Sequence, residues 1–148
     1  MLQKFKRIIG IVFVILTLFT LSVTPSAQAD PSLPEPNNNG DYIEQTSHTS
    51  WTVVDRDPSG LNCRMGTQPI DEIWSPEYAG FPPINSWPVV TTLAANETFE
   101  AKISDAGFAT TLDQDFKPWI YIADRLNNEA ANCFVRANQA FVQPIPEP

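Results

Sequence analysis

The stretch LNCRMG, residues 61–66, says more about the fold of this chain than any other. It follows DPSG at 57–60, in which proline and glycine are typical of a tight turn. Two later stretches complete the pattern that it begins, PVVTTL at 88–93 and CFVR at 133–136. Together the three stretches predict a small extracytoplasmic β-barrel whose ends are joined by one disulfide.

The N-terminus has the layout of a secretory signal peptide. Three basic residues within the first seven positions precede an apolar run over 8–23, and the small-x-small sequence AQA then ends at Ala29. We expect cleavage between Ala29 and Asp30, which removes 1–29 and leaves a secreted or periplasmic chain without a stable membrane anchor. The alternative is a retained anchor, but the run is shorter than the ~20 apolar residues of a spanning helix.

The charge and length of the mature chain limit its possible partners. All 17 acidic residues remain after cleavage but only six of the 9 basic ones, which gives a net charge of −11. Nucleic acids and anionic membranes attract basic surfaces, so we expect neither as a partner. A mature chain of about 119 residues is enough for one domain with a modest core. No residue pattern predicts a cofactor.

Both cysteines, Cys63 and Cys133, lie in the mature part. An even number of cysteines in an exported chain predicts a disulfide, which the chain-entropy model values at roughly 4 kcal/mol for a loop of this length. The alternative is a metal-binding or redox thiol pair, but the sequence has neither a C-x-x-C spacing nor a nearby histidine.

The mature chain divides into a leader, a folded domain and a tail. Residues 30–48 begin with a polar, proline-rich stretch and are predicted to form a disordered leader, because they bury too little apolar surface to offset their ordering entropy. The folded domain should span 49–145, and the proline-rich tail 146–148 should add no structure. Residues 124–132 should form a polar hairpin loop.

The domain itself should be all-β. Short β-branched, aromatic or alternating runs, separated by turn residues, favour five to six strands in a sandwich or barrel. These runs lie at 51–54, from Leu61, and at 89–93, 98–103, 119–122 and 133–135.

The order of these runs resembles the bacterial Src-homology-3-like (SH3b-type) domain. That family typically has a Leu-Asn-Val-Arg-x-Gly-Pro stretch, a Pro-Val-led strand, a Val-Glu-Val-like strand, a Trp-x-x-Val strand and a closing Gly-Trp-Val. The corresponding pieces here, over 53–145, are 61–66, 88–93, 97–103, 119–122 and 133–135. Two features depart from the family: the loop after Gly66 is much longer, and Asn96 replaces a turn glycine, which asparagine can do because it tolerates a left-handed backbone.

The resemblance implies both a fold and a role. The fold would be a small SH3-like barrel of five to six short strands, with one long aromatic-rich loop and one disulfide. Cys63 and Cys133 would lie on neighbouring strands, so that a disulfide between them is feasible. The role would be a module that binds cell-wall peptide or glycan.

The long connection over 67–87 holds the best candidates for ligand binding. Connections of this length are usually functional or have order of their own, and aromatic side chains beside prolines can form a groove for a peptide or a sugar. We expect Trp74 and Tyr78 to be exposed and Trp87 to be buried. The alternative is that the aromatics cover an open edge of the barrel. The candidate ligand-binding residues are Trp74, Tyr78, Phe81, Asp71 and Glu72.

Three other patterns could carry chemistry, but none favours catalysis or a metal site. Residues 55–60 match the start of an EF-hand loop, yet Gly66 stands where a calcium-binding glutamate is needed, so a tight turn is the better interpretation. Asp113 and Asp115 could serve a glycoside hydrolase, but the surrounding sequence indicates a wet loop. His48 is the only histidine and is expected to be solvent-exposed, without zinc or triad partners.

The sequence thus predicts an exported, non-catalytic module that contacts cell-wall peptide or glycan, or a partner protein. A structural or accessory subunit of a larger assembly is the alternative, and the sequence does not distinguish the two. A small carboxylate-dependent hydrolase is a third reading, and the lack of a nucleophile–base–metal arrangement speaks against it.

Overall fold

A computed structural model describes residues 33–125 and 130–146 of the chain. The predicted signal peptide, its cleavage site and residues 126–129 of the predicted hairpin loop therefore lie outside the described residues. Residues 124–125 and 130–132, also expected in that loop, belong to strands. In the part that is described, no helix has both the length and the apolar character needed to cross a membrane.

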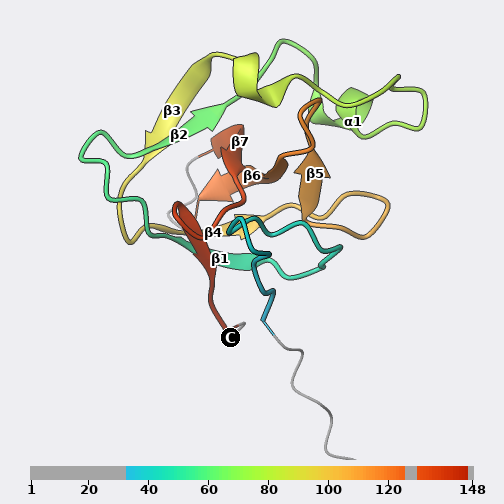
Figure 1. The fold of residues 1–148 in the computed structure, drawn as a ribbon. Coiled ribbons are helices and arrows are strands. Elements are labelled where there is room, and N and C mark those ends of the chain that lie inside the picture. The colour runs from blue at the N-terminus through green and yellow to red at the C-terminus, as the bar shows by residue number, and fades with distance from the viewer. Residues whose placement is uncertain (1–32, 126–129, 147–148) are drawn as a thin grey trace, which may run out of the picture. The chain divides into compact units, whose positions relative to one another are not determined.

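The described chain forms one antiparallel sheet of eight strands. Figure 1 shows how the sheet curves round on itself. The predicted all-β class is confirmed. The strands run in the order β3-β2-β7-β6-β4-β1-β8, with β5 paired to β6 outside this path, so the barrel-like sheet is not closed between its end strands β3 and β8. The strands are β1 Ser50–Val53, β2 Leu61–Arg64, β3 Val89–Leu93, β4 Thr98–Ala101, β5 Thr110–Leu112, β6 Pro118–Arg125, β7 Ala130–Arg136 and β8 Val142–Pro144.

All six predicted strands are present, and β5 and β8 are additional. Each of the two has only three residues, too few to show an alternating pattern. Pro144 is tolerated in β8 because this strand lies at the edge of the sheet. Between β3 and β4, Asn96 has a φ of +66°, which confirms the left-handed turn expected of it.

The β6–β7 hairpin is buried on both faces, and this two-sided burial organises the core. Ile120 and Ile122 of β6 enter one hydrophobic cluster with Cys133 and Val135 of β7. The alternate residues of the same strands, among them Trp119, Tyr121 and Phe134, enter a second cluster. Side chains of a strand alternate between its faces, so the second cluster needs a cover of its own.

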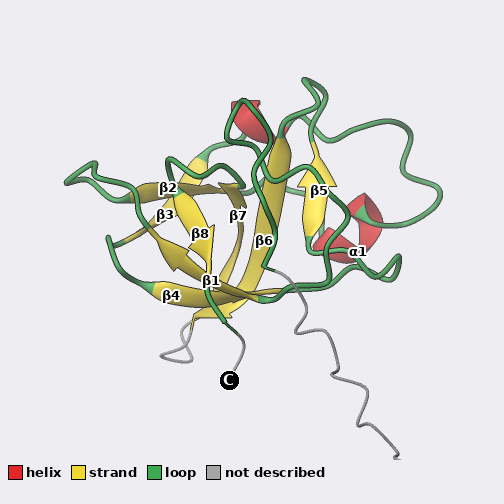
Figure 2. Ribbon diagram, turned by 60° about the horizontal axis from the view of Figure 1, so that its bottom comes forward, coloured by secondary structure: helices red, strands yellow, loops and turns green. Residues whose placement is uncertain are grey.

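The long connection supplies this cover. It contains a short helix, α1 Ile70–Ile73, and a 3₁₀ turn, η1 Ile84–Ser86, whose isoleucines Ile70, Ile73 and Ile84 are buried in the second cluster. In Figures 1 and 2 α1 lies beside β5, the strand that extends the sheet next to β6. The connection therefore has order of its own, and its three isoleucines are part of the core.

Gly66 lies where this connection leaves β2, and it has little space. A Cβ atom at this position would come within 2.8 Å of the Trp87 ring. The glycine that ends the LNCRMG stretch therefore lets the end of the connection pack closely against its beginning.

The predicted disulfide between Cys63 and Cys133 is confirmed, with the two Cα atoms 5.4 Å apart. It joins β2 to β7, two neighbouring strands that share a single registered pair, Arg64 with Phe134. The disulfide thus strengthens the seam at which the two strands are joined by few ladder contacts. A disulfide of this kind indicates an oxidising compartment.

The prediction of a disordered leader is wrong for the described part of that segment. Tyr42 is buried in the first core cluster, and Asp41 accepts a hydrogen bond of 2.6 Å from Arg136 and another of 2.6 Å from Asn138. These partners lie about ninety-five residues further along the chain, so the local composition of the leader could not reveal them.

His48 is likewise not simply solvent-exposed, as had been expected. Its ring is partly buried, with Nε2 2.7 Å from the carbonyl oxygen of Ser50, and it packs edge-on against Trp51 at 5.6 Å between ring centroids. The histidine therefore helps to hold the N-terminal segment against β1.

Candidate functional site

The two aromatic residues expected to be exposed, Trp74 and Tyr78, are partly buried against the second core cluster. The indole Nε1 of Trp74 donates a hydrogen bond of 3.0 Å to Thr111 Oγ1 of β5, and its ring meets Tyr121 edge-on at 5.6 Å. Trp87, expected to be buried, is also partly buried and packs on Phe134. These three aromatics pack against the second face of the β6–β7 hairpin, and not on an open edge of the barrel as the alternative interpretation had it.

The two acidic candidates, Asp71 and Glu72, are exposed on α1. Asp71 lies 3.6 Å from Lys102 Nζ, which itself stands 5.7 Å from the centre of the Trp74 ring. An exposed ion pair of this kind contributes little to stability. Asp71 and Glu72 therefore remain available to a ligand, beside a tryptophan whose main contacts are with the core.

Phe81 is the aromatic candidate that remains exposed, and the structure gives it a partner that the sequence did not. Its side chain is 48% exposed and meets Phe116, 66% exposed, edge-on with ring centroids 5.2 Å apart. A hydrogen bond of 3.2 Å from the Gln114 amide to the Pro82 carbonyl joins the two loops beside this contact. We call Phe81 and Phe116 the aromatic pair.

Phe116 occupies a turn that is held by a buried carboxylate. Asp113 has no exposed surface; its Oδ1 accepts the backbone N–H groups of Asp115 and Lys117 at 2.9 Å each, and its Oδ2 accepts Trp119 Nε1 at 2.8 Å. The expectation that Asp113 lies in a wet loop is therefore wrong. Its three donors explain its burial, because a buried carboxylate needs hydrogen-bond partners.

The backbone of Phe116 is left-handed, with a φ of +56°. This region is costly for a bulky L-residue, and glycine or asparagine usually takes such positions. The chain nevertheless places a large apolar side chain there and exposes most of it to solvent. Strained positions that persist in a well-held turn tend to mark functional sites.

One signal in the sequence could have revealed Phe116. It is the only apolar residue in DQDFK at 113–117, a polar turn between two strands. An isolated aromatic residue in a polar turn has no apolar neighbours in the sequence that could be buried together with it. The sequence therefore predicts that the Phe116 ring is exposed. The contact with Phe81, by contrast, is visible only in three dimensions.

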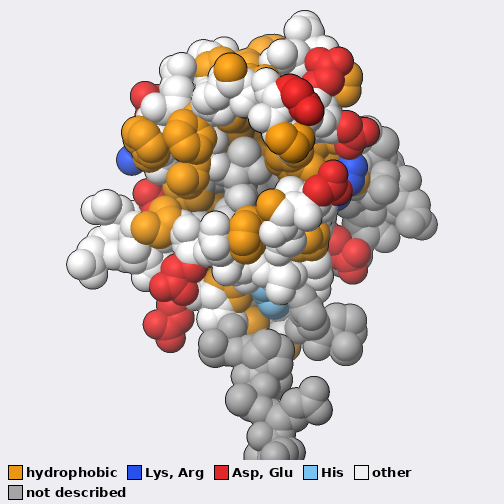
Figure 3. Space-filling view, turned by 90° about the vertical axis from the view of Figure 1, so that its right-hand side faces the viewer, with side chains coloured by type: hydrophobic (Ala, Val, Ile, Leu, Met, Phe, Trp, Pro, Cys, Tyr) orange, Lys and Arg blue, Asp and Glu red, His pale blue; other side chains and the backbone are white. Residues whose placement is uncertain are grey.

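The side of the molecule on which α1 and β5 lie faces the viewer in Figure 3. Hydrophobic side chains gather there in several groups, with acidic side chains between and around them. The surface on this side therefore combines groups of hydrophobic side chains with acidic ones.

The other patterns singled out in the sequence are accounted for by turns. Asp55 Oδ1 accepts the N–H of Asp57 at 3.0 Å, and Asp57 Oδ1 accepts that of Ser59 at 2.8 Å, the pattern of two successive side-chain-capped turns. Over residues 33–125 and 130–146, no three His, Cys, Asp or Glu side chains gather as a group that could hold a metal ion.

The chain matches no protein-family model, no curated protein and no solved structure.

Proposed function

We propose that the chain is a secreted or periplasmic, non-catalytic binding module whose aromatic pair stacks on the peptide or glycan of the bacterial cell wall. The observation that carries the proposal is Phe116, an exposed aromatic with a φ of +56° that packs edge-on against the exposed Phe81. Folding alone would favour glycine or asparagine at this turn, so a large ring there is best explained by a ligand.

Three further observations support the proposal. The disulfide indicates an oxidising compartment, as outside the cytoplasm, and the N-terminal sequence has the layout of an export signal. Exposed aromatic faces are the side chains that stack on sugars and anchor extended peptides. The resemblance to the SH3b-type domain implies the same class of ligand.

The test uses a substitution that removes the ring and relieves the backbone at the same time. Phe116→Asn and Phe116→Gly abolish the aromatic pair but suit a left-handed position, so the melting temperature should stay within a few degrees of wild type or rise. Sedimentation with purified peptidoglycan should weaken about thirtyfold, the equivalent of ~2 kcal/mol lost with an aromatic anchor.

Ile43→Thr is the matched control, because it removes another exposed apolar side chain, 47% exposed, from the N-terminal segment. It should leave wall binding unchanged. Peptide-free glycan strands and free stem peptides, titrated separately, show which part of the wall is bound. A Phe116→Asn variant that binds peptidoglycan as strongly as the wild type would refute the proposed role of the aromatic pair. A wild-type protein that binds neither glycan strands nor stem peptides would refute the proposed function.

A further inference from the structure

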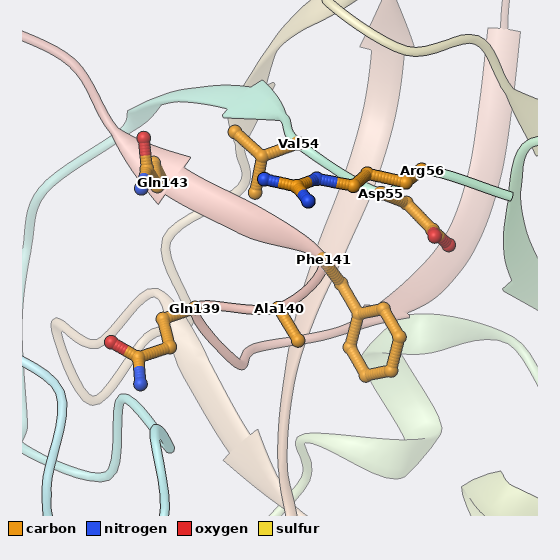
Figure 4. Close-up of a pocket in the computed structure, with 7 residues that line it drawn as sticks. All are labelled: Val54, Asp55, Arg56, Gln139, Ala140, Phe141 and Gln143. Atoms are coloured by element: carbon orange, nitrogen blue, oxygen red, sulfur yellow. The ribbon is translucent and has the colours of Figure 1, made fainter.

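A cleft on a different part of the molecule contains a cation that is not neutralised. It lies where β1 ends, between residues 54–56 and the chain that leads into β8. Its volume is about 490 Å³, and its wall includes Val54, Asp55, Arg56, Gln139, Phe141 and Gln143. We call it the Arg56 cleft; Figure 4 shows its side chains.

Arg56 is the feature of the cleft that needs an explanation. In the described part of the chain its guanidinium has no ion pair and no side-chain hydrogen bond, whereas Lys102 and Arg136 each have a carboxylate partner. Arg56 also lines a second hollow of about 350 Å³, formed with the turns at 57–60 and 92–97. Arg56 is exposed, so the N–H donors of its guanidinium remain available to a ligand.

The walls of the cleft are held in place by the backbone. The N–H groups of Val54 and Asp55 both donate to the Phe141 carbonyl, at 2.8 and 3.2 Å, and the Phe141 N–H donates to the Asn138 carbonyl at 2.8 Å. In Figure 4 the guanidinium of Arg56 lies beside Val54 and extends toward the side of Gln143, whereas Gln139 and the ring of Phe141 lie on the other side of the strand that carries Gln143. A charged donor and an apolar ring that line the same cleft suit a ligand with both characters.

The surrounding charge restricts the ligand further. Arg56 stands between Asp55 and Asp57 in a chain of net charge −8, so a polyanion would be repelled by the molecule as a whole. A single carboxylate can still make a bidentate contact with the guanidinium, which is planar and always charged. The apolar wall of Val54 and Phe141 would take a small apolar group attached to that carboxylate.

The geometry points to the Arg56 cleft as a binding site for a ligand with one carboxylate on a small apolar group, of the kind that ends a peptide chain. Arg56 holds the carboxylate, Gln139 and Gln143 donate to it or to a neighbouring amide, and Phe141 contacts the apolar part. The site is independent of the aromatic pair, and its ligand can be tested whether or not that pair binds the cell wall.

The test is an NMR titration of the purified exported chain with N-acetyl-alanine and with its neutral amide. The acid should shift the Arg56 side-chain Nε–H and the backbone amides of 139–143, and should bind at least tenfold more tightly than the amide, which lacks the charge that Arg56 recognises. Binding of the acid should weaken in high salt, because the contact is at the surface.

Two substitutions decide the role of the guanidinium. Arg56→Gln should weaken binding of the acid at least tenfold without lowering the melting temperature, since Arg56 holds no other part of the protein together. Lys117→Gln removes another exposed cation and should leave the affinity unchanged. Four results would each overturn the proposal. Two concern the wild-type protein: equal affinity for acid and amide, or a titration without shifts at 139–143. The other two concern the variants: an Arg56→Gln protein that binds the acid as wild type does, or a Lys117→Gln protein weakened as much as Arg56→Gln.

Discussion

The indole Nε1 of Trp119 donates a hydrogen bond of 2.8 Å to Oδ2 of Asp113, a carboxylate without exposed surface. Trp119 belongs to the covered face of the β6–β7 hairpin, and Asp113 holds the turn that carries Phe116. The contact therefore joins the core to the candidate ligand-binding surface.

Removing the Asp113 carboxylate should damage both stability and binding. Asp113→Ala leaves the Trp119 indole and two backbone N–H groups without their acceptor, and buried unsatisfied donors cost ~1–3 kcal/mol each. We expect a loss of at least about 3 kcal/mol in urea unfolding, together with weaker peptidoglycan sedimentation. Asp113→Asn keeps one acceptor oxygen and should lose less; equal stability of the alanine variant and wild type would contradict this role.

Loss of the disulfide should open the β2–β7 seam before the rest of the sheet. The double variant Cys63→Ala, Cys133→Ala should be less stable by ~2–5 kcal/mol, as is typical of small exported domains. Hydrogen exchange should rise first in β2 and β3, because β2 is otherwise joined to β7 by a single registered pair. Reduced wild-type protein is the control and should show the same pattern. Uniform exchange across all strands would show that the seam has no special weakness.

The Asp41–Arg136 ion pair should hold the N-terminal segment against the sheet. Both side chains are largely buried, and removing one partner of such a pair typically costs ~3–5 kcal/mol. Asp41→Ala should therefore lower stability and make residues 33–48 sensitive to limited proteolysis, as measured by mass spectrometry of the fragments. Glu44→Ala, at an exposed acidic position nearby, is the control and should leave the segment protected.

Trp74 and Phe81 should respond to substitution in opposite ways. Trp74→Ala removes a hydrogen bond to Thr111 and a contact with Tyr121, so we expect a loss of roughly 3 kcal/mol in stability. Phe81→Ala removes an exposed ring and should change stability little but reduce wall binding. Thermal melting and peptidoglycan sedimentation of the two variants separate these effects, and a Trp74→Ala protein that melts like wild type would mean that the tryptophan is not part of the core cover.

Alkaline solution should destabilise the protein through Tyr42. Burial raises the pKa of this phenol above its ordinary value of about 10, because the charged form is poorly solvated in the core. The unfolded chain ionises first, so the stability from neutral Tyr42 is complete below about pH 10 and is lost as pH rises through the folded-state value. Tyr42→Phe should lower the sensitivity of unfolding to pH in this range, and an unchanged pH profile would contradict the assignment.

Local signals in the sequence were enough for the six longer strands, the disulfide and the left-handed turn at Asn96. β-branched runs and turn residues each act over a few positions, and the even number of cysteines was enough to pair the two; each feature was found where it was predicted. Local signals could not predict the contacts between segments that are far apart in the sequence. The burial of Tyr42 and Asp41 depends on a strand near the other end of the chain, and the cover over Tyr121 depends on a connection fifty residues earlier.

The candidate site divides in the same way. Residues 67–87 are visibly rich in aromatic side chains with acidic neighbours, and Phe81 could be identified among them from the sequence. The fold was needed to show that Trp74, Tyr78 and Trp87 cover the second face of a hairpin, and that Phe116 joins Phe81 at the surface. Aromatic residues are equally suited to a core and to a ligand, so their role depends on what the fold places opposite them, and local sequence does not contain that information.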